Sequence, residues 1–248
     1  MPDMTVAQAL LLFVAGLGAG FVNAVAGGGS AITLPILTEL LDASIANGTN
    51  RVAILIANIT ASASYGKGGA VPWKAVRPLI IPAVIGSAAG AWAASLVSPD
   101  AMKRVFSVVL ILVAASVALR PARWVQNRQA ALGEPWRSIV FFGIGFYGGF
   151  VQAGVGFLLL AGLVLGGGLD LVRANAAKVV IIASYTVVAL VIFFGAAQVN
   201  LGVGLVLAAG NSTGAFVSSR IAMKRGAGWV RWILVVAAVA AAIRMAFL

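Results

Sequence analysis

The 248-residue sequence contains no cysteine, no histidine and only six acidic residues. The absence of cysteine excludes disulfides and a thiol nucleophile, and the absence of histidine excludes the common zinc sites and a histidine proton shuttle. The acidic residues, which we expect in loops or at the ends of apolar segments, are Asp3, Glu39, Asp42, Asp100, Glu134 and Asp170. Because no acid lies within an apolar segment, we predict no catalytic residues, no metal site, no cofactor and no enzymatic activity, and strong proton coupling is disfavoured.

Charged residues of either sign are scarce. They make up 9% of the chain, against 62% hydrophobic residues, whereas soluble domains carry about 25% charged residues. The sequence therefore predicts an integral membrane protein, and its net charge of +11 is explained by basic cytoplasmic loops rather than by binding to nucleic acid. The first eight residues contain an acid and no lysine or arginine, so we expect no cleaved signal peptide.

One uncharged run, residues 4–38, cannot form a single ordinary membrane helix. Gly27, Gly28, Gly29 and Ser30 interrupt it, and Pro35 follows. Each glycine costs a helix about 1 kcal/mol relative to alanine. In lipid, unwound backbone persists only where protein or a water-filled cavity satisfies its N–H and C=O groups. This pattern predicts two short helices that meet near the middle of the membrane, as at the binding sites of transporters.

The other apolar segments divide the chain into two units of similar design. We predict an all-α fold, a polytopic membrane helix bundle of two inverted repeats, each with a glycine-broken helix pair plus three spanning helices. The first repeat is residues 1–119, a polar cytoplasmic connector is 120–136, and the second repeat is 137–248. The expected helices are 5–26 with 31–41, 44–65, 76–96, 101–119, the glycine-interrupted 138–164, 171–194, 201–221 and 229–248.

The two units show internal similarity. An offset of 129 residues aligns GLGAGFVNAVAG (16–27) with GFYGGFVQAGVG (145–156), with six identities, and places Asn23 over Gln152. An offset of 127 places Arg51 over Lys178, and an offset of 124 aligns GSAAGAW (86–92) with GNSTGAF (210–216). Because the three matches keep their order along the chain, we interpret them as a duplication.

The basic residues predict how the two units are oriented. If each broken pair enters and leaves on one side, thirteen of the seventeen lysines and arginines fall on one side of the membrane and four on the other. If each broken segment instead crosses once, the basic loops 120–137 and 220–231 lie on opposite sides, against the positive-inside rule. We therefore expect the second repeat to be inverted relative to the first, with both termini outside.

Arg51 and Lys178 are the basic residues most relevant to function. The uncharged run from Val52 to Gly66 has 15 residues, about 22 Å of helix, which is shorter than the roughly 30 Å hydrocarbon core. Since Lys67 lies in an evident turn, Arg51 is expected within the membrane. Either Arg51 and Lys178 approach the centre from opposite faces and attract an anion, or both snorkel to the interface.

The glycine breaks supply a second group of candidates. A half-helix beginning at Ala31–Thr33 would direct free N–H groups towards the break, and a helix N-terminus favours anions. Ser30 and Thr33 add hydroxyl donors, and Asn23 faces the break. In the second unit, Gln152, Gly154 and Gly156 occupy the equivalent place. Close helix packing through small residues is the alternative, and we favour it for Gly16 and Gly20.

A third polar group, Asn211 to Thr213, lies in an otherwise apolar helix. It lines the cavity or makes hydrogen bonds between helices, and the sequence leaves both open. Tyr185 follows Lys178 by two helical turns, as Asn58 follows Arg51, so either can line a path. The candidate substrate-binding residues are Asn23, Gly27, Gly28, Gly29, Ser30, Thr33, Thr49, Asn50, Arg51, Gln152, Gly154, Gly156, Asn175, Lys178, Tyr185 and Asn211.

Three stretches carry a family resemblance: GLGAGFVNAVAGGGSAITLPIL (16–37), NGTNR (47–51) and GFYGGFVQAGVGFLLLAGLVLGG (145–167). The sequence resembles the sulfite exporter TauE/SafE family, also called the toluene-sulfonate uptake permease superfamily, over about residues 9–243. The resemblance implies a bacterial inner-membrane permease linked to sulfite, sulfoacetate or other sulfur-containing organic anions, usually as an exporter. It also implies that Asn23, Gly27–Ser30 and Thr49–Arg51 lie near the transport path.

We therefore expect a multi-pass permease of the bacterial inner membrane that moves a small anion, most simply sulfite or a sulfonate, outwards by alternating access. Its partners would be the anion and the lipid bilayer, with a homodimer as an open alternative and no nucleic acid. The alternatives are an anion channel of the same fold and a transporter of another small carboxylate or oxyanion. A membrane enzyme or a structural scaffold is disfavoured.

Overall fold

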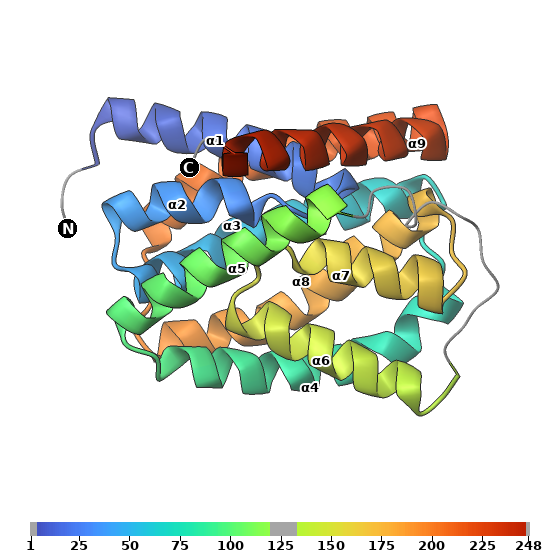
Figure 1. Ribbon diagram of the computed structural model, residues 1–248, viewed down its shortest axis with the longest axis horizontal. Helices are drawn as coiled ribbons and strands as arrows, with labels where there is room; N and C mark the ends of the chain where they lie inside the picture. Colours follow the sequence, from blue (N-terminus) through green and yellow to red (C-terminus); the bar gives the residue numbers. More distant parts are fainter. Residues whose placement is uncertain (1–3, 120–132, 247–248) are drawn as a thin grey trace.

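The computed structural model describes residues 4–119 and 133–246, and every element in these ranges is a helix (Figure 1). The all-α prediction is therefore confirmed. The elements are α1 (Val6–Val25), α2 (Ser30–Leu40), α3 (Ala43–Lys67), α4 (Trp73–Ser95), α5 (Pro99–Leu119), α6 (Trp136–Phe150), α7 (Val155–Ala161) with a π-helical turn (Gly162–Gly166), α8 (Leu171–Gly195) and α9 (Leu201–Ala246). Most of the expected connector 120–136 lies outside the described residues.

Several helices are long and apolar enough to cross a membrane. Within the described residues, four helical segments meet this criterion by length and composition: Val6–Val25, Trp73–Ser95, Leu171–Gly195 and Leu201–Gly226. The last of these ends at Gly226, whose φ of +71° breaks the helical geometry inside α9. Figure 1 shows that α9 turns back there, so the two expected helices 201–221 and 229–248 exist as the two arms of α9.

The first apolar run is broken where the sequence predicts. Helix α1 ends at Val25 and α2 begins at Ser30. The chain turns at Gly27, whose φ of +94° is a backbone conformation that a side chain disfavours. The second run is broken in a similar way between α6 and α7, where Gln152 and Gly154 have φ of +69° and +71°. The offset of 129 residues places the end of α1, Val25, over Gly154. Helix α6 nevertheless ends at Phe150, about one turn earlier.

Equivalent glycines of the two units approach equivalent carbonyl groups of the opposite unit. A Cβ at Gly16 would lie 2.5 Å from the Leu207 carbonyl oxygen, and one at Gly145 would lie 2.2 Å from that of Ala83. The offset of 129 residues relates Gly16 to Gly145, and the offset of 124 relates Ala83 to Leu207, so the two contacts are equivalent in the two units. The packing role expected for Gly16 and Gly20 is confirmed, since Gly20 contacts the Asn211 carbonyl in the same way.

The helices run roughly parallel to the long axis of the molecule, with their connections at its two ends. In Figure 1 the α2–α3, α4–α5 and α8–α9 connections lie at the left, and the α3–α4 and α7–α8 connections lie at the right. The pair α1 and α2 thus starts and finishes at one end, and the pair α6 and α7 at the other. The interpretation as repeats inverted in a membrane, with both termini outside, stays a prediction.

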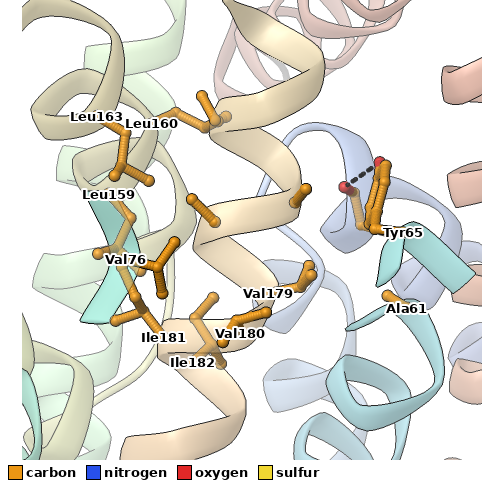
Figure 2. Packing of buried hydrophobic residues seen from close by; sticks show 14 of the residues in the cluster. Ala61, Tyr65, Val76, Leu159, Leu160, Leu163, Val179, Val180, Ile181 and Ile182 are labelled. Carbon is orange, nitrogen blue, oxygen red and sulfur yellow. Dashed lines mark hydrogen bonds between the residues drawn. The ribbon is translucent and has the colours of Figure 1, made fainter. Parts of the chain in front are cut away.

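The largest buried cluster lies around α8. Figure 2 shows Ile181 of α8 on the same side as Leu159 and Leu163 of the α7 segment and Val76 of α4, whereas Val179 is directed to the opposite side of α8. On the other side of α8, Tyr65 is fully buried and its hydroxyl donates to the Ala24 carbonyl at 3.4 Å. This contact fixes the last turn of α1, and hence the first break, against the C-terminal half of α3.

Candidate functional site

Arg51 lies fully buried on α3, with its side chain directed at the second break. Its guanidinium donates to the carbonyls of Gly148 and Gly149, near the end of α6, and to the side-chain oxygen of Gln152. It also donates to Asn47, one turn earlier on α3, at 3.3 Å. Because Arg51 is 0% exposed, the snorkelling alternative is wrong for this residue.

An aromatic ring completes the surroundings of Arg51. The guanidinium carbon lies 5.2 Å from the centre of the Phe193 ring, within range of a cation–π interaction. The Nε of Arg51 is buried and has no hydrogen-bond partner among the described residues. The guanidinium is therefore held by carbonyl oxygens, an amide and an aromatic face, while one donor stays unused.

Lys178 is the equivalent cation on α8, and its side chain is directed at the first break. Its Nζ donates to the backbone carbonyl of Asn23 and to the Asn175 side chain, both at 2.7 Å. The side chain is 0% exposed, so snorkelling is wrong here too. Arg51 lies about 12 Å along α3 from its first residue, and Lys178 lies about 10 Å along α8 from its first residue. The two helices begin at opposite ends of the molecule (Figure 1).

Neither buried cation is neutralised by an acid. In the parts of the chain that the structure describes, the ion pairs are Arg137–Glu134 and Arg173–Asp170, both at helix ends. Burying a charge without a counter-ion costs several kcal/mol, and the hydrogen bonds that the cations donate to neutral carbonyls compensate only part of this. The centre of the bundle thus carries an excess of positive charge.

The first break brings several candidates together. Gly27, Gly28 and Gly29 form the turn and Ser30 begins α2. The Thr33 hydroxyl of α2 donates to the side-chain oxygen of Asn50 on α3 at 2.8 Å. The expectation of free N–H groups at Ala31–Thr33 is wrong, because these groups donate to the carbonyls of Gly28 and Gly29. At this break, the backbone N–H groups of the described residues Gly28, Gly29 and Ser30 have no backbone acceptor.

The two breaks touch each other at glycine. A Cβ at Gly27 would lie 2.4 Å from the Gly156 Cα, and one at Gly156 would lie 2.3 Å from the Gly27 Cα. Gly154 provides the left-handed residue before α7. Asn23 and Gln152, which the offset of 129 residues aligns, use different groups: Asn23 offers its backbone carbonyl to Lys178, and Gln152 its side chain to Arg51.

Tyr185 lies beside Arg51. A Cβ at Gly148, whose carbonyl binds Arg51, would lie 2.8 Å from the Tyr185 hydroxyl. That hydroxyl is buried and has no hydrogen-bond partner among the described residues, and the same holds for the Asn50 Nδ2 and for the Thr186 hydroxyl on α8. Asn175 makes its second hydrogen bond to the Leu171 carbonyl of its own helix.

Thr49 and Asn211 make no hydrogen bond to Arg51 or Lys178 in the described chain. The Thr49 hydroxyl accepts from the backbone N–H of Asn200, at the start of α9, at 2.9 Å. Asn211 packs against Gly20 of α1. Ser212 and Thr213 bond to the Ala209 carbonyl within α9 and are not buried. Of the third polar group, only Asn211 is therefore an interior residue.

Four residues that contact Arg51 were not among the candidates selected from the sequence. Asn47 precedes it by four residues, so it lies on the same face of α3, and this spacing could have identified it. The carbonyls of Gly148 and Gly149 are accessible because these residues lack side chains, but their partner is 97 and 98 positions away. Phe193 carries no local signal, since aromatic residues are common in membrane helices.

Known proteins match the chain over nearly its whole length. The family model described as sulfite exporter TauE/SafE matches residues 12–245. Probable membrane transporter protein ORF9 of Sinorhizobium sp. is 30% identical over 247 residues, covering 99% of this chain and 95% of its own. Probable membrane transporter protein YfcA of Escherichia coli K12 is 28% identical over 229 residues, covering 92% and 85%. A probable membrane transporter protein of Haemophilus influenzae is 25% identical over 241 residues, covering 94% and 92%. No solved structure matches the chain.

Proposed function

Because this chain belongs to the sulfite exporter TauE/SafE family, we propose that it is a membrane permease that exports sulfite or a sulfur-containing organic anion such as a sulfonate by alternating access. The proposal places the protein in the bacterial inner membrane with its more basic loops in the cytoplasm. An anion that leaves a negative-inside cell gains about 2.3 kcal/mol per charge per 100 mV, so export needs no coupled proton.

The observation that carries this proposal is the pair of fully buried cations without an acid. Arg51 and Lys178 lie on neighbouring helices and are both 0% exposed. Two buried positive charges destabilise the fold, and a bound ligand of negative charge would compensate this cost. A small anion that binds between α3, α8 and the two breaks would provide this compensation.

Unused hydrogen-bond donors near Arg51 suit an oxyanion. The Nε of Arg51, the Nδ2 of Asn50 and the Tyr185 hydroxyl are buried without partners in the described chain. Leaving a buried donor unpaired costs about 1–3 kcal/mol. The several acceptor oxygens of sulfite or a sulfonate group can satisfy such donors, and a guanidinium is well suited to planar, bidentate recognition of them.

The coverage of both cations favours a carrier over a channel. A continuous pore would expose them to water, whereas both side chains are completely covered by protein. Alternating access therefore requires the packing around them to open on one side at a time. The two breaks meet at Gly27 and Gly156. Each break lies next to the carbonyl groups that one of the cations binds, and we propose that the two breaks act as the hinges of this opening.

Anion binding should be measurable as stabilisation of the purified protein. At a concentration of 100 times Kd, sulfite is expected to stabilise the fold by about 2.7 kcal/mol, which raises Tm by about 5–10 °C for a chain of this length. Sulfite, sulfate, thiosulfate, sulfoacetate and taurine should be compared in one thermal-shift series. The shift should disappear in Arg51→Gln and weaken in Arg51→Lys, which keeps the charge but loses the planar fork.

Arg77→Gln is the matched control for this series. Arg77 is exposed on α4, so its removal changes the net charge equally and should leave the shift intact. A full shift in a folded Arg51→Gln variant, or equal shifts for all anions in wild type and variants, would remove Arg51 from the site.

Tyr185→Phe should separate a binding role from a structural one. Because the Tyr185 hydroxyl is buried and unpaired, its removal is expected to leave Tm unchanged or higher. Transport in proteoliposomes should nevertheless show a KM raised about tenfold, the effect of one lost hydrogen bond to a charged group. Tyr65→Phe is the control, since the Tyr65 hydroxyl bonds to Ala24: it should lower Tm and leave KM unchanged. An unchanged KM in Tyr185→Phe would argue against contact with the anion.

A further inference from the structure

A second feature of the molecule is an open pocket between the C-terminal half of α3 and the first arm of α9. Its volume is about 700 Å³. It lies towards the end of the molecule where α3 finishes and where α9 turns back at Gly226 (Figure 1). None of its lining residues contacts Arg51 or Lys178 through a hydrogen bond.

The rim of this pocket is basic. Lys67, Arg220 and Lys224 line it, all three are exposed, and no carboxylate is among the lining residues. The Arg220 guanidinium carbon lies 4.2 Å from the centre of the Phe216 ring, so a cation–π contact holds this side chain at the pocket. The rim therefore offers converging positive charge without a protein counter-ion.

The part of the pocket nearer the middle of the bundle includes exposed apolar side chains. Ile59 and Phe216 line it and are 52% and 39% exposed. Ile59 precedes Lys67 by eight residues on α3, about 12 Å towards the middle of the bundle, and Phe216 precedes Arg220 by one turn of α9. Basic groups at the end of the molecule and exposed apolar side chains nearer its middle match a ligand with a charged head and a hydrocarbon tail.

The pocket is not the entrance to the cation site. Successive residues of an α-helix are about 100° apart, so Thr60, nine positions after Arg51, lies about 180° around α3 from it. Lys67, sixteen positions after Arg51, lies about 160° around. The pocket thus occupies the opposite face of α3 from the one that carries Arg51, and an anion in it would be separated from Arg51 by the helix itself.

We propose that this pocket binds an anionic glycerophospholipid, with its phosphate between Lys67 and the pair Arg220 and Lys224 and its acyl chains along Ile59 and Phe216. A hydroxyl is available as an additional donor, because Ser64 lines the pocket, is 7% exposed and has no hydrogen-bond partner in the described chain. Basic pockets between membrane helices are suited to anionic headgroups, which are attracted to such clusters. The proposal does not depend on which substrate the permease moves.

Native mass spectrometry of the full-length protein in detergent tests this assignment. Phosphatidylglycerol and phosphatidylethanolamine with identical acyl chains are compared, and phosphatidylglycerol is expected to bind more tightly. The double variant Lys67→Gln with Arg220→Gln should bind phosphatidylglycerol about thirtyfold more weakly, the effect of losing two basic contacts. The matched control is Lys74→Gln with Arg77→Gln, which removes one lysine and one arginine from exposed positions outside the pocket and should bind as wild type does.

A conservative variant and a free anion complete the experiment. Lys67→Arg with Arg220→Lys keeps both charges and should retain the lipid, which separates charge loss from misfolding. Equal affinity for the two lipids, or equal loss in the Gln double variant and in its control, would overturn the proposal. Displacement of phosphatidylglycerol by an equal concentration of inorganic phosphate would also overturn it, because the pocket would then be a site for a free anion.

Discussion

Lys178→Met is expected to reduce anion transport and anion-dependent stabilisation strongly while the protein still folds. Methionine has a similar length and no charge, so the variant removes the cation with little change in volume. Loss of the hydrogen bonds to Asn23 and Asn175 costs about 1–3 kcal/mol for each acceptor left unpaired. This cost is offset in part because the variant no longer pays the desolvation penalty of a buried charge without a counter-ion. Transport should fall about 10- to 100-fold, since a charged contact with the substrate contributes about 1.5–3 kcal/mol.

The measurement is sulfite uptake into proteoliposomes, with the melting temperature of the same preparation recorded without ligand. Lys74→Met is the matched control, because it removes the same charge from an exposed position at the start of α4. A folded Lys178→Met variant that transports sulfite at the wild-type rate would show that Lys178 only supports the end of α1.

Gly27→Ala is expected to be the most destabilising single substitution in the first break. Its Cβ would lie 2.4 Å from the Gly156 Cα and 3.0 Å from the backbone N of Phe157, and the φ of Gly27 is +94°. Backbone atoms cannot move aside as a flexible side chain can, so the two breaks must separate. We expect a loss of more than about 3 kcal/mol, because strain at a positive φ adds to overpacking. Gly156→Ala should have a similar effect, since its Cβ would lie 2.3 Å from the Gly27 Cα.

Gly18→Ala controls for the change of glycine to alanine within the same run. A Cβ at Gly18 would meet nothing within 4 Å, and alanine is the better helix former by about 1 kcal/mol. The Gly18 variant should therefore give a normal monodisperse peak in size-exclusion chromatography and an equal or higher Tm, whereas Gly27→Ala should give little folded protein. Similar yields and melting temperatures for the two variants would mean that the contact between the breaks is not tightly packed.

The sequence predicts the features that depend on local chemistry. Successive glycines cannot continue a membrane helix, and α1 accordingly ends at Val25. The uncharged run after Arg51 is too short to cross the hydrocarbon core, which predicts that this arginine lies within the membrane, and the structure shows that its side chain is buried in the protein. The pairing of Arg51 with Lys178 follows from internal similarity, and each lies buried beside the break of the other unit.

Features that depend on contacts between distant segments could not be predicted in this way. The bond from Arg51 to Gly148 joins residues 97 positions apart, and nothing near either residue specifies the other. The unit similarity also hides a difference: α6 ends at Phe150, so Gln152 lies beyond the helix with φ of +69°, whereas Asn23 stays within α1. This one-turn difference explains why Gln152 uses its side chain and Asn23 its backbone.

The central claim, that the buried cations bind the transported anion, is tested most directly by locating an anomalously scattering oxyanion in a crystal of the protein. Selenite has the shape and charge of sulfite, and selenium gives an anomalous signal. The account predicts a selenium peak that places a selenite oxygen within hydrogen-bond distance of the Arg51 Nε or the Tyr185 hydroxyl, and its loss in the Lys178→Met variant. A peak that lies only among surface lysines and arginines, with none beside Arg51 in a crystal soaked well above the Kd, would contradict it.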